Sequence, residues 1–183
     1  MDQYRGALEE LGGVFDRLDQ GAVAALVEAL AGARRIVVSG AGRERLQIMG
    51  LAMRLAHLGR DAHVAGEMGC PPVGRGDLLL VTCGPGHLPT VAALMAQARG
   101  AGAQVAAITA QPGGPDMALA DLVLHLPAQT MADDRGAARS SVLPMGSLFE
   151  GALFVLFEVM VLRLMARLGV TADGMRARHT NLE

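Results

Sequence analysis

The chain has 183 residues, a formal net charge of −2 and a composition that is 51% hydrophobic, with one Tyr and no Trp. This length suits a single domain with its own core. The small charge, without a basic block, excludes the electrostatic footprint of a nucleic-acid-binding protein, and the scarcity of aromatic residues excludes a base-stacking platform. Cys70 and Cys83 form neither a CxxC motif nor a metal-ligand spacing, which favours the reducing cytoplasm.

Residues 2 to about 31 predict two helices, broken near 19–21. The first of them is acidic and amphipathic, unlike a signal or transit peptide. Five short apolar runs follow, and such runs are typical of parallel strands covered on both faces. We expect strands at 35–40, 61–66, 77–84, 104–110 and 122–127.

Helical periodicity fills 43–59, between the first two predicted strands, and 89–102, between the third and fourth. These strand–helix–strand units predict a doubly wound parallel sheet. The connection from Gly66 to Asp77 holds two prolines and is too short for a crossover helix. We therefore expect strand one to lie between strands two and three, which is a flavodoxin-like order.

Residues 127–144 are small, polar and bounded by prolines, which predicts an exposed loop. A long apolar helix is expected over 146–168, capped by Ser147 or nearby backbone. Glu158 and Arg163 interrupt this stretch, so no apolar run reaches the roughly 18 residues of a membrane span. We expect one domain over 1–183, with N-terminal helices over 1–31 and a C-terminal helix and solvated tail over 145–183.

Two glycine-rich turns follow predicted strands one and three, at 39–43 and 83–89. Such turns can present backbone N–H groups to an anion, although glycine is often needed there merely to turn the chain. The first turn lacks the third glycine of a dinucleotide fingerprint, so a nicotinamide cofactor is not expected. Because ligands of open α/β sheets bind at the carboxyl ends of strands, the two turns favour a shared small-molecule site.

Six stretches resemble the 6-phospho-3-hexuloisomerases of the sugar-isomerase (SIS) domain family. They are "GAGR" (40–43), "AMRLAHLG" (52–59), "AHVAGE" (62–67), "PPVGRGDLLL" (71–80), "LPMGSLFE" (143–150) and "RHTNLE" (178–183). The resemblance implies a three-layer α-β-α sandwich around a five-stranded parallel sheet, assembled as a homotetramer or a dimer. It also implies conversion of D-arabino-hex-3-ulose 6-phosphate to fructose 6-phosphate, downstream of formaldehyde fixation, with no metal and no organic cofactor.

Moving a ketone from C3 to C2 requires a base that takes the C2 proton and returns one at C3, through an enediol. The resemblance assigns this role to Glu150, although the residues alone equally suit a carboxylate at a helix start. It implies that His179 reaches a neighbouring subunit's site, where it polarises the carbonyl or handles a hydroxyl proton. Glu67 either lines the pocket or bonds to the proline loop that follows it.

The chain departs from the family pattern where the substrate phosphate is bound. The family commonly has Gly-Ser-Gly-Ser-Gly-Glu-Thr-Lys at positions 82–89, where this chain has "TCGPGHLP". Three hydroxyls are lost, and each proline also removes a backbone donor. Glu44 stands where the family has a substrate-binding serine, and its carboxylate would repel a phosphate. The remaining substrate-binding candidates are the N–H groups of Gly84, Gly86 and His87, the His87 ring, Pro85 in the same turn, and Arg43 or Arg45.

Three functions follow from these observations. The first is a phosphosugar isomerase close to the 6-phospho-3-hexuloisomerases. The second keeps the isomerase chemistry but acts on a sugar that lacks the phosphate or bears it elsewhere. The third is a non-catalytic sugar-phosphate sensor or scaffold, because fold alone does not decide function. All three predict a small sugar or phosphosugar as the ligand and neither nucleic acid nor membrane as a partner.

Overall fold

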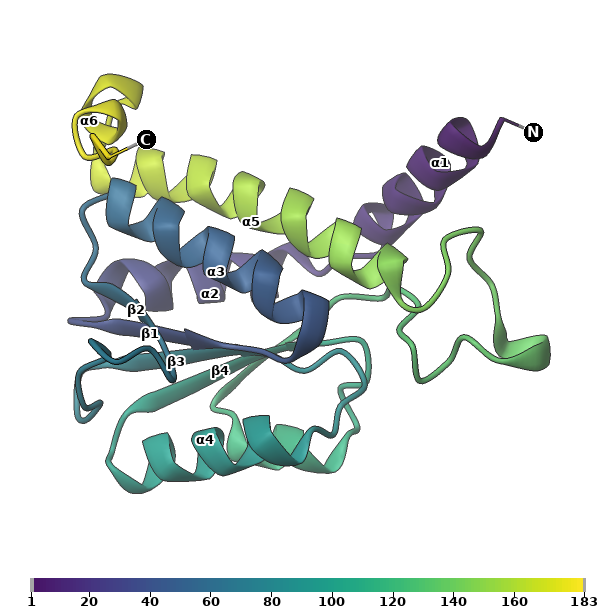
Figure 1. The fold of residues 1–183 in the computed structure, drawn as a ribbon, viewed down its shortest axis with the longest axis horizontal. Coiled ribbons are helices and arrows are strands. Elements are labelled where there is room, and N and C mark those ends of the chain that lie inside the picture. Colours follow the sequence, from purple (N-terminus) through teal and green to yellow (C-terminus); the bar gives the residue numbers. More distant parts are fainter. Residues whose placement is uncertain (1, 183) are drawn as a thin grey trace.

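A computed structural model of the chain describes residues 2–182 (Figure 1). Met1 and Glu183, the last residue of the predicted tail, lie outside this range. The helices are α1 (Gln3–Asp16), α2 (Gln20–Gly32), α3 (Gly42–His57), α4 (Pro89–Gly100), α5 (Ser147–Leu168) and α6 (Ala172–Arg176). Short 3₁₀ helices lie at Pro115–Leu119 and Gly136–Ala138. The predicted break near 19–21 is confirmed, and Asp19 caps α2 by accepting the Gly21 N–H at 2.8 Å.

The sheet has five parallel strands in the order β2-β1-β3-β4-β5, which confirms the predicted topology. The strands are β1 (Ile36–Ser39), β2 (Ala62–Val64), β3 (Leu78–Thr82), β4 (Gln104–Thr109) and β5 (Leu122–His125). β1 lies between β2 and β3, and a loop without a helix connects these two strands. The strand order reverses beside β1, so the carboxyl ends of β1 and β3 flank the switch point.

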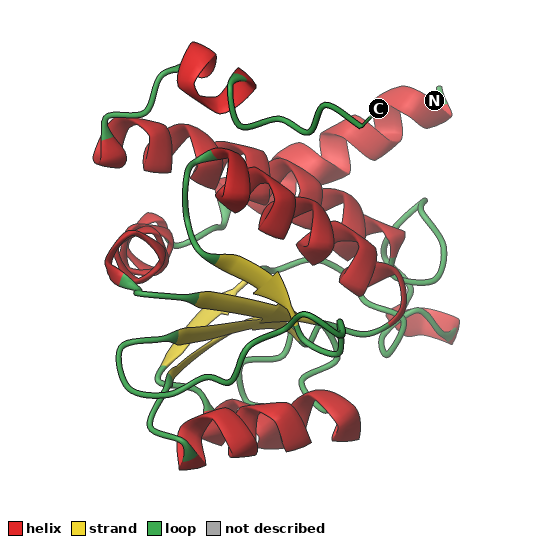
Figure 2. Ribbon diagram, turned by 60° about the vertical axis from the view of Figure 1, so that its left-hand side comes forward, coloured by secondary structure: helices red, strands yellow, loops and turns green. Residues whose placement is uncertain are grey.

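Helices cover both faces of the sheet, which confirms the predicted α-β-α sandwich (Figure 1, Figure 2). Alternate residues of β1 point to opposite sides: Ile36 and Val38 pack with α2, α3 and α5, whereas Val37 packs with α4. The long helix α5 lies across α2 and α3, so one face carries two helical layers. None of the helices within residues 2–182 is long and apolar enough to span a membrane.

The exposed loop predicted over 127–144 is confirmed over most of 131–145, but some polar residues of the segment 127–146 are buried. Gln129, Thr130 and Ser141 are buried. The Gln129 side-chain oxygen accepts the Ser141 N–H at 2.8 Å, and Glu10 of α1 accepts the Val142 N–H, also at 2.8 Å. Small polar residues suit solvent in general, but here they supply side-chain hydrogen bonds that tie the segment to the protein.

Of the two caps predicted for α5, the Ser147 side chain is not used, and backbone at Gly146 begins the helix. Gly146 occupies the N-cap position with a left-handed backbone (φ 80°), and Ser147 is the first helical residue. A Cβ atom at position 146 would lie 2.8 Å from the backbone nitrogen of Met131. Only glycine suits both the backbone angle and this close approach.

We expect Gly146→Ala to lower the free energy of unfolding by about 2 kcal/mol, through left-handed strain and the contact with Met131. Gly151→Ala in the same helix is the matched control. Its new methyl group would lie 3.5 Å from the Leu11 side chain, an ordinary contact. Alanine also favours helix interiors, so that variant should be neutral or more stable. Chemical denaturation would compare the two, and equal effects would contradict this account of the α5 start.

Candidate active site

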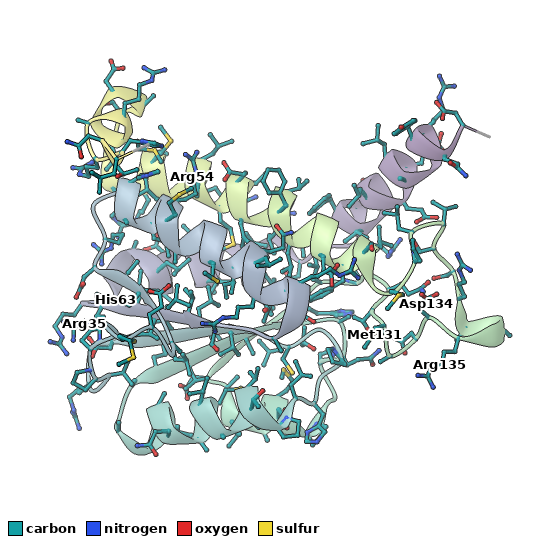
Figure 3. The ribbon with its side chains drawn as sticks, in the orientation of Figure 1. Arg35, Arg54, His63, Met131, Asp134 and Arg135 are labelled. Atoms are coloured by element: carbon teal, nitrogen blue, oxygen red, sulfur yellow. The ribbon has the colours of Figure 1, made fainter. Side chains whose placement is uncertain are left out.

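A cavity of about 540 Å³ opens beside the carboxyl ends of β1 and β3. It is enclosed by the start of α3, the turn after β3, the segment 130–146 and the start of α5. Figure 3 shows Met131 and Arg135 on the segment that faces the first turns of α3 and α5. The lining residues are Ala41, Gly42, Arg43, Glu44, Pro85, Leu88, Thr130, Met131, Ala132, Arg135, Met145, Gly146, Phe149 and Glu150.

Glu150 is the carboxylate on the α5 side of the cavity, and Arg43 holds it in place. Arg43 Nε lies 3.0 Å from Glu150 Oε2. The other guanidinium nitrogens donate to Ser147 Oγ at 3.0 Å and to the Met145 carbonyl at 2.6 Å. The Glu150 side chain is only 15% exposed, and burial raises the pKa of Glu150 although Arg43 opposes this. A desolvated carboxylate of this kind holds its proton more readily than an exposed one, which suits a group that accepts and returns a proton.

The backbone beside the Arg43–Glu150 pair is strained at Met145. Met145 has a positive φ of 56°, which is uncommon for a residue other than glycine. Its N–H donates to Asp134 and its carbonyl accepts from Arg43, so two hydrogen bonds hold the conformation. Strain maintained in this way is typical of functional sites.

Glu44 is a second carboxylate on the same cavity, at the first turn of α3. Its oxygens accept the Gly84 N–H at 3.0 and 3.3 Å. Burial raises the pKa of Glu44 to about 7, against the lowering effect of the Gly84 hydrogen bond. Glu44 therefore changes its charge close to neutral pH.

A third carboxylate, Asp116, does not line the cavity but forms hydrogen bonds with the turn after β3. This buried side chain accepts the Leu88 N–H at 2.7 Å, and its other oxygen lies 2.8 Å from Nδ1 of His87. The Gly86 N–H donates to the carbonyl of Cys83. Burial raises the pKa of Cys83 to about 12, so its thiol stays protonated and unreactive.

Of the three N–H groups expected to remain available to a ligand, those of Gly84 and Gly86 are already used within the chain, whereas the His87 N–H donates to none of the described residues. Glu44 accepts the first, and the Cys83 carbonyl accepts the second. The His87 ring faces Asp116. Of the turn's residues, only Pro85 and Leu88 line the cavity.

Of the other predicted site residues, Arg43, Glu44, Pro85 and Glu150 line the cavity, whereas three lie elsewhere. Glu67 lines a separate cavity with Cys70 and Pro71. Arg45 donates to the Ala65 carbonyl at 2.9 Å. The ring of His179 lies 5.1 Å from that of His57, at the end of α3 remote from Glu44.

Thr130, Met131 and Arg135 line the cavity but were not predicted from the sequence. They belong to a polar segment without strand or helix periodicity, and no local pattern distinguishes them from solvent-exposed residues. Among residues 2–182, no group of three or more His, Cys, Asp or Glu side chains is arranged to hold a metal ion.

The raised pKa of Glu44 makes stability depend on pH. The protonated Glu44 carboxyl contributes fully to the free energy of unfolding below its ordinary pKa of 4.5. This contribution is lost as the pH rises through about 7. Relative to Glu44→Gln, which does not titrate, the wild type should therefore lose up to about 3 kcal/mol between pH 4.5 and 8. Thermal melts across this range would measure the difference. Glu9→Gln, on the exposed side of α1, is the control. If the difference in stability between the wild type and Glu44→Gln did not change with pH, the raised pKa of Glu44 would be contradicted.

Known proteins with curated names resemble this chain over most of its length. It is 38% identical to a 3-hexulose-6-phosphate isomerase of Mycobacterium gastri, over 96% of this chain and 87% of that protein. It is 34% identical to a 3-hexulose-6-phosphate isomerase of Bacillus subtilis (strain 168), over 86% of this chain and 85% of that protein.

A solved structure has the same fold. The crystal structure of a hypothetical protein of Methanococcus jannaschii, described as inferring a 3-hexulose-6-phosphate isomerase function, superposes with a TM-score of 0.86. It covers 100% of both chains at 24% identity, which supports the fold alone. The SIS domain model matches residues 29–155, a span that contains all five strands and the starts of α3, α4 and α5. Because this model covers more than half of the chain, the chain belongs to the SIS domain family.

Proposed function

We propose that this protein is a sugar isomerase that moves a carbonyl between C3 and C2 of a ketose, with Glu150 as the base. The observation that carries the proposal is the partly desolvated Glu150 carboxylate, held by Arg43 at 3.0 Å on the wall of a sugar-sized cavity. The names of the curated relatives support the same chemistry. They favour D-arabino-hex-3-ulose 6-phosphate, or a ketose with the same carbonyl position and a different group at its far end.

Glu150 would act twice in this reaction. Its carboxylate takes the proton from C2 while the C3 carbonyl oxygen gains a proton, which leaves a C2–C3 enediol. The carboxyl then returns its proton to C3 as the C2 hydroxyl gives up a proton, so the product is the 2-ketose. Arg43 keeps the Glu150 oxygens aimed at one face of the sugar, and burial keeps the carboxyl proton available. The protons on oxygen need a second group within reach.

We infer that His179 of a neighbouring subunit is this second group, in a cytoplasmic tetramer or dimer. Within its own chain, His179 lies at the end of α3 remote from the cavity. Large apolar side chains are exposed on the adjacent helices α3 and α5, which supports an interface there. They are Leu46, Met53, Phe154 and Leu162, each more than half exposed.

Glu150→Gln should lower the rate of isomerisation by about 100- to 10,000-fold while sugar binding is kept, because the amide cannot take the proton. The assay follows fructose 6-phosphate formed from hex-3-ulose 6-phosphate, and solvent deuterium exchange at C2 extends it to other ketoses. Glu158→Gln, farther along α5 and 3.1 Å from Arg54, is the matched control and should keep its activity. Full activity in Glu150→Gln would exclude Glu150 as the base. Binding without turnover in the wild type would favour a sensor.

A site shared between subunits predicts complementation. Glu150→Gln and His179→Ala should each be inactive alone. When the two are co-expressed in equal amounts, about a quarter of the sites should combine a wild-type Glu150 with a neighbour's wild-type His179. Purified mixed oligomers should recover activity in that proportion. No recovery, or a monomer by light scattering, would remove His179 from the site.

A further inference from the structure

The residues of the turn after β3 that line the cavity offer it no free N–H group, and the His87 N–H lies outside this lining. The turn meets the cavity only at Pro85, which has no N–H, and at Leu88, whose N–H already donates to Asp116 at 2.7 Å. The Gly84 N–H, next to Pro85, donates to Glu44. A turn before a helix ordinarily uses such groups to bind an external anion. Here the carboxylates of Glu44 and Asp116 accept these N–H groups instead of an external anion.

The surroundings of Gly84 are crowded and mainly apolar. A Cβ atom at Gly84 would lie 2.7 Å from Glu44 Oε1 and 3.1 Å from the Phe149 ring. Phe149 is buried, and Pro85 and Leu88 complete this end of the cavity. A phosphate placed here would lose its water without gaining donors, and it would lie against a carboxylate. The desolvation of a doubly charged group would then remain uncompensated.

The two arginines on the cavity do not change this balance. Arg43 already binds Glu150, Ser147 and the Met145 carbonyl. Arg135 is exposed on the segment across the cavity from Glu44 and the turn. Neither arginine donates to Glu44 among the described residues.

We propose that the substrate presents an uncharged hydroxyl group, and not a phosphate, to Glu44 and the turn at 83–89. The inference rests on the isomerase function above and narrows its substrate to a ketose without a phosphate at this end. A sugar hydroxyl can donate to the Glu44 oxygens, which keep a free acceptor position beside Gly84. Such a group needs no N–H donors from the turn. The side chain at position 44 then selects between substrates by the charge on the end group of the sugar.

The test compares D-arabino-hex-3-ulose with its 6-phosphate in the full-length protein. Solvent deuterium exchange at C2, followed by NMR, measures kcat/KM for both at about pH 8, where Glu44 is mostly ionised. We expect the unphosphorylated sugar to be preferred at least tenfold, roughly the value of one hydrogen bond to a charged group. A preference for the 6-phosphate would overturn the proposal.

Glu44→Ser is the decisive variant, because it removes the carboxylate and frees the Gly84 N–H. Its preference should shift toward the 6-phosphate by about tenfold or more, and sulfate should become a competitive inhibitor. Glu9→Ser loses the same charge on the exposed side of α1 and should keep the wild-type preference. An unchanged preference in Glu44→Ser would contradict the role given to Glu44.

Calorimetric titration with sulfate separates this proposal from the isomerase function. If neither sugar exchanges deuterium in a folded wild-type oligomer, the isomerase function fails, and sulfate binding still tests the role of Glu44. Sulfate bound by Glu44→Ser but not by the wild type would support the proposal. Equal binding by both proteins, or binding by neither, would overturn it.

Discussion

Because helices cover both faces of the sheet, the central strands are apolar up to their carboxyl ends, where Ser39 and Thr82 are the only polar residues of β1 and β3. β1 and β3 are buried at every position, and their side chains alternate between two separate clusters. Polar chemistry is therefore confined to the places where strands end and helices begin. The position of β1 between β2 and β3 puts two such places side by side. The cavity, both of its carboxylates and the turn at 83–89 all follow from this arrangement.

Arg43 connects the parts of this edge that come from distant sequence. It stands in the first turn of α3, yet its guanidinium binds the Met145 carbonyl, Ser147 and Glu150 around the start of α5. One residue thus contacts both the Glu150 carboxylate and the strained segment before it. Because a planar guanidinium has several donors in a rigid arrangement, it suits this role better than a lysine.

Glu44 and Asp116 change what this edge can bind. A family member with serine at position 44 would leave the Gly84 N–H open, whereas Glu44 fills it with a charge from the chain itself. Burial of that carboxyl costs stability at neutral pH, as its raised pKa shows. A loss of stability of this kind, at a residue on a cavity wall, is typical of functional residues.

The sequence by itself determined the sheet, the strand order and the two turns, because apolar runs, helical periodicity and the short link at 66–77 are local signals. It also pointed to Glu150 and Glu44, through the family motifs around them. The tertiary structure alone decided which N–H groups stay free, that Arg43 binds Glu150, and that the segment 130–146 forms a wall. These outcomes depend on contacts between residues as far apart as Arg43 and Ser147, or Gly84 and Glu44. No local pattern encodes such contacts, since packing and hydrogen bonding form them only when the chain has folded.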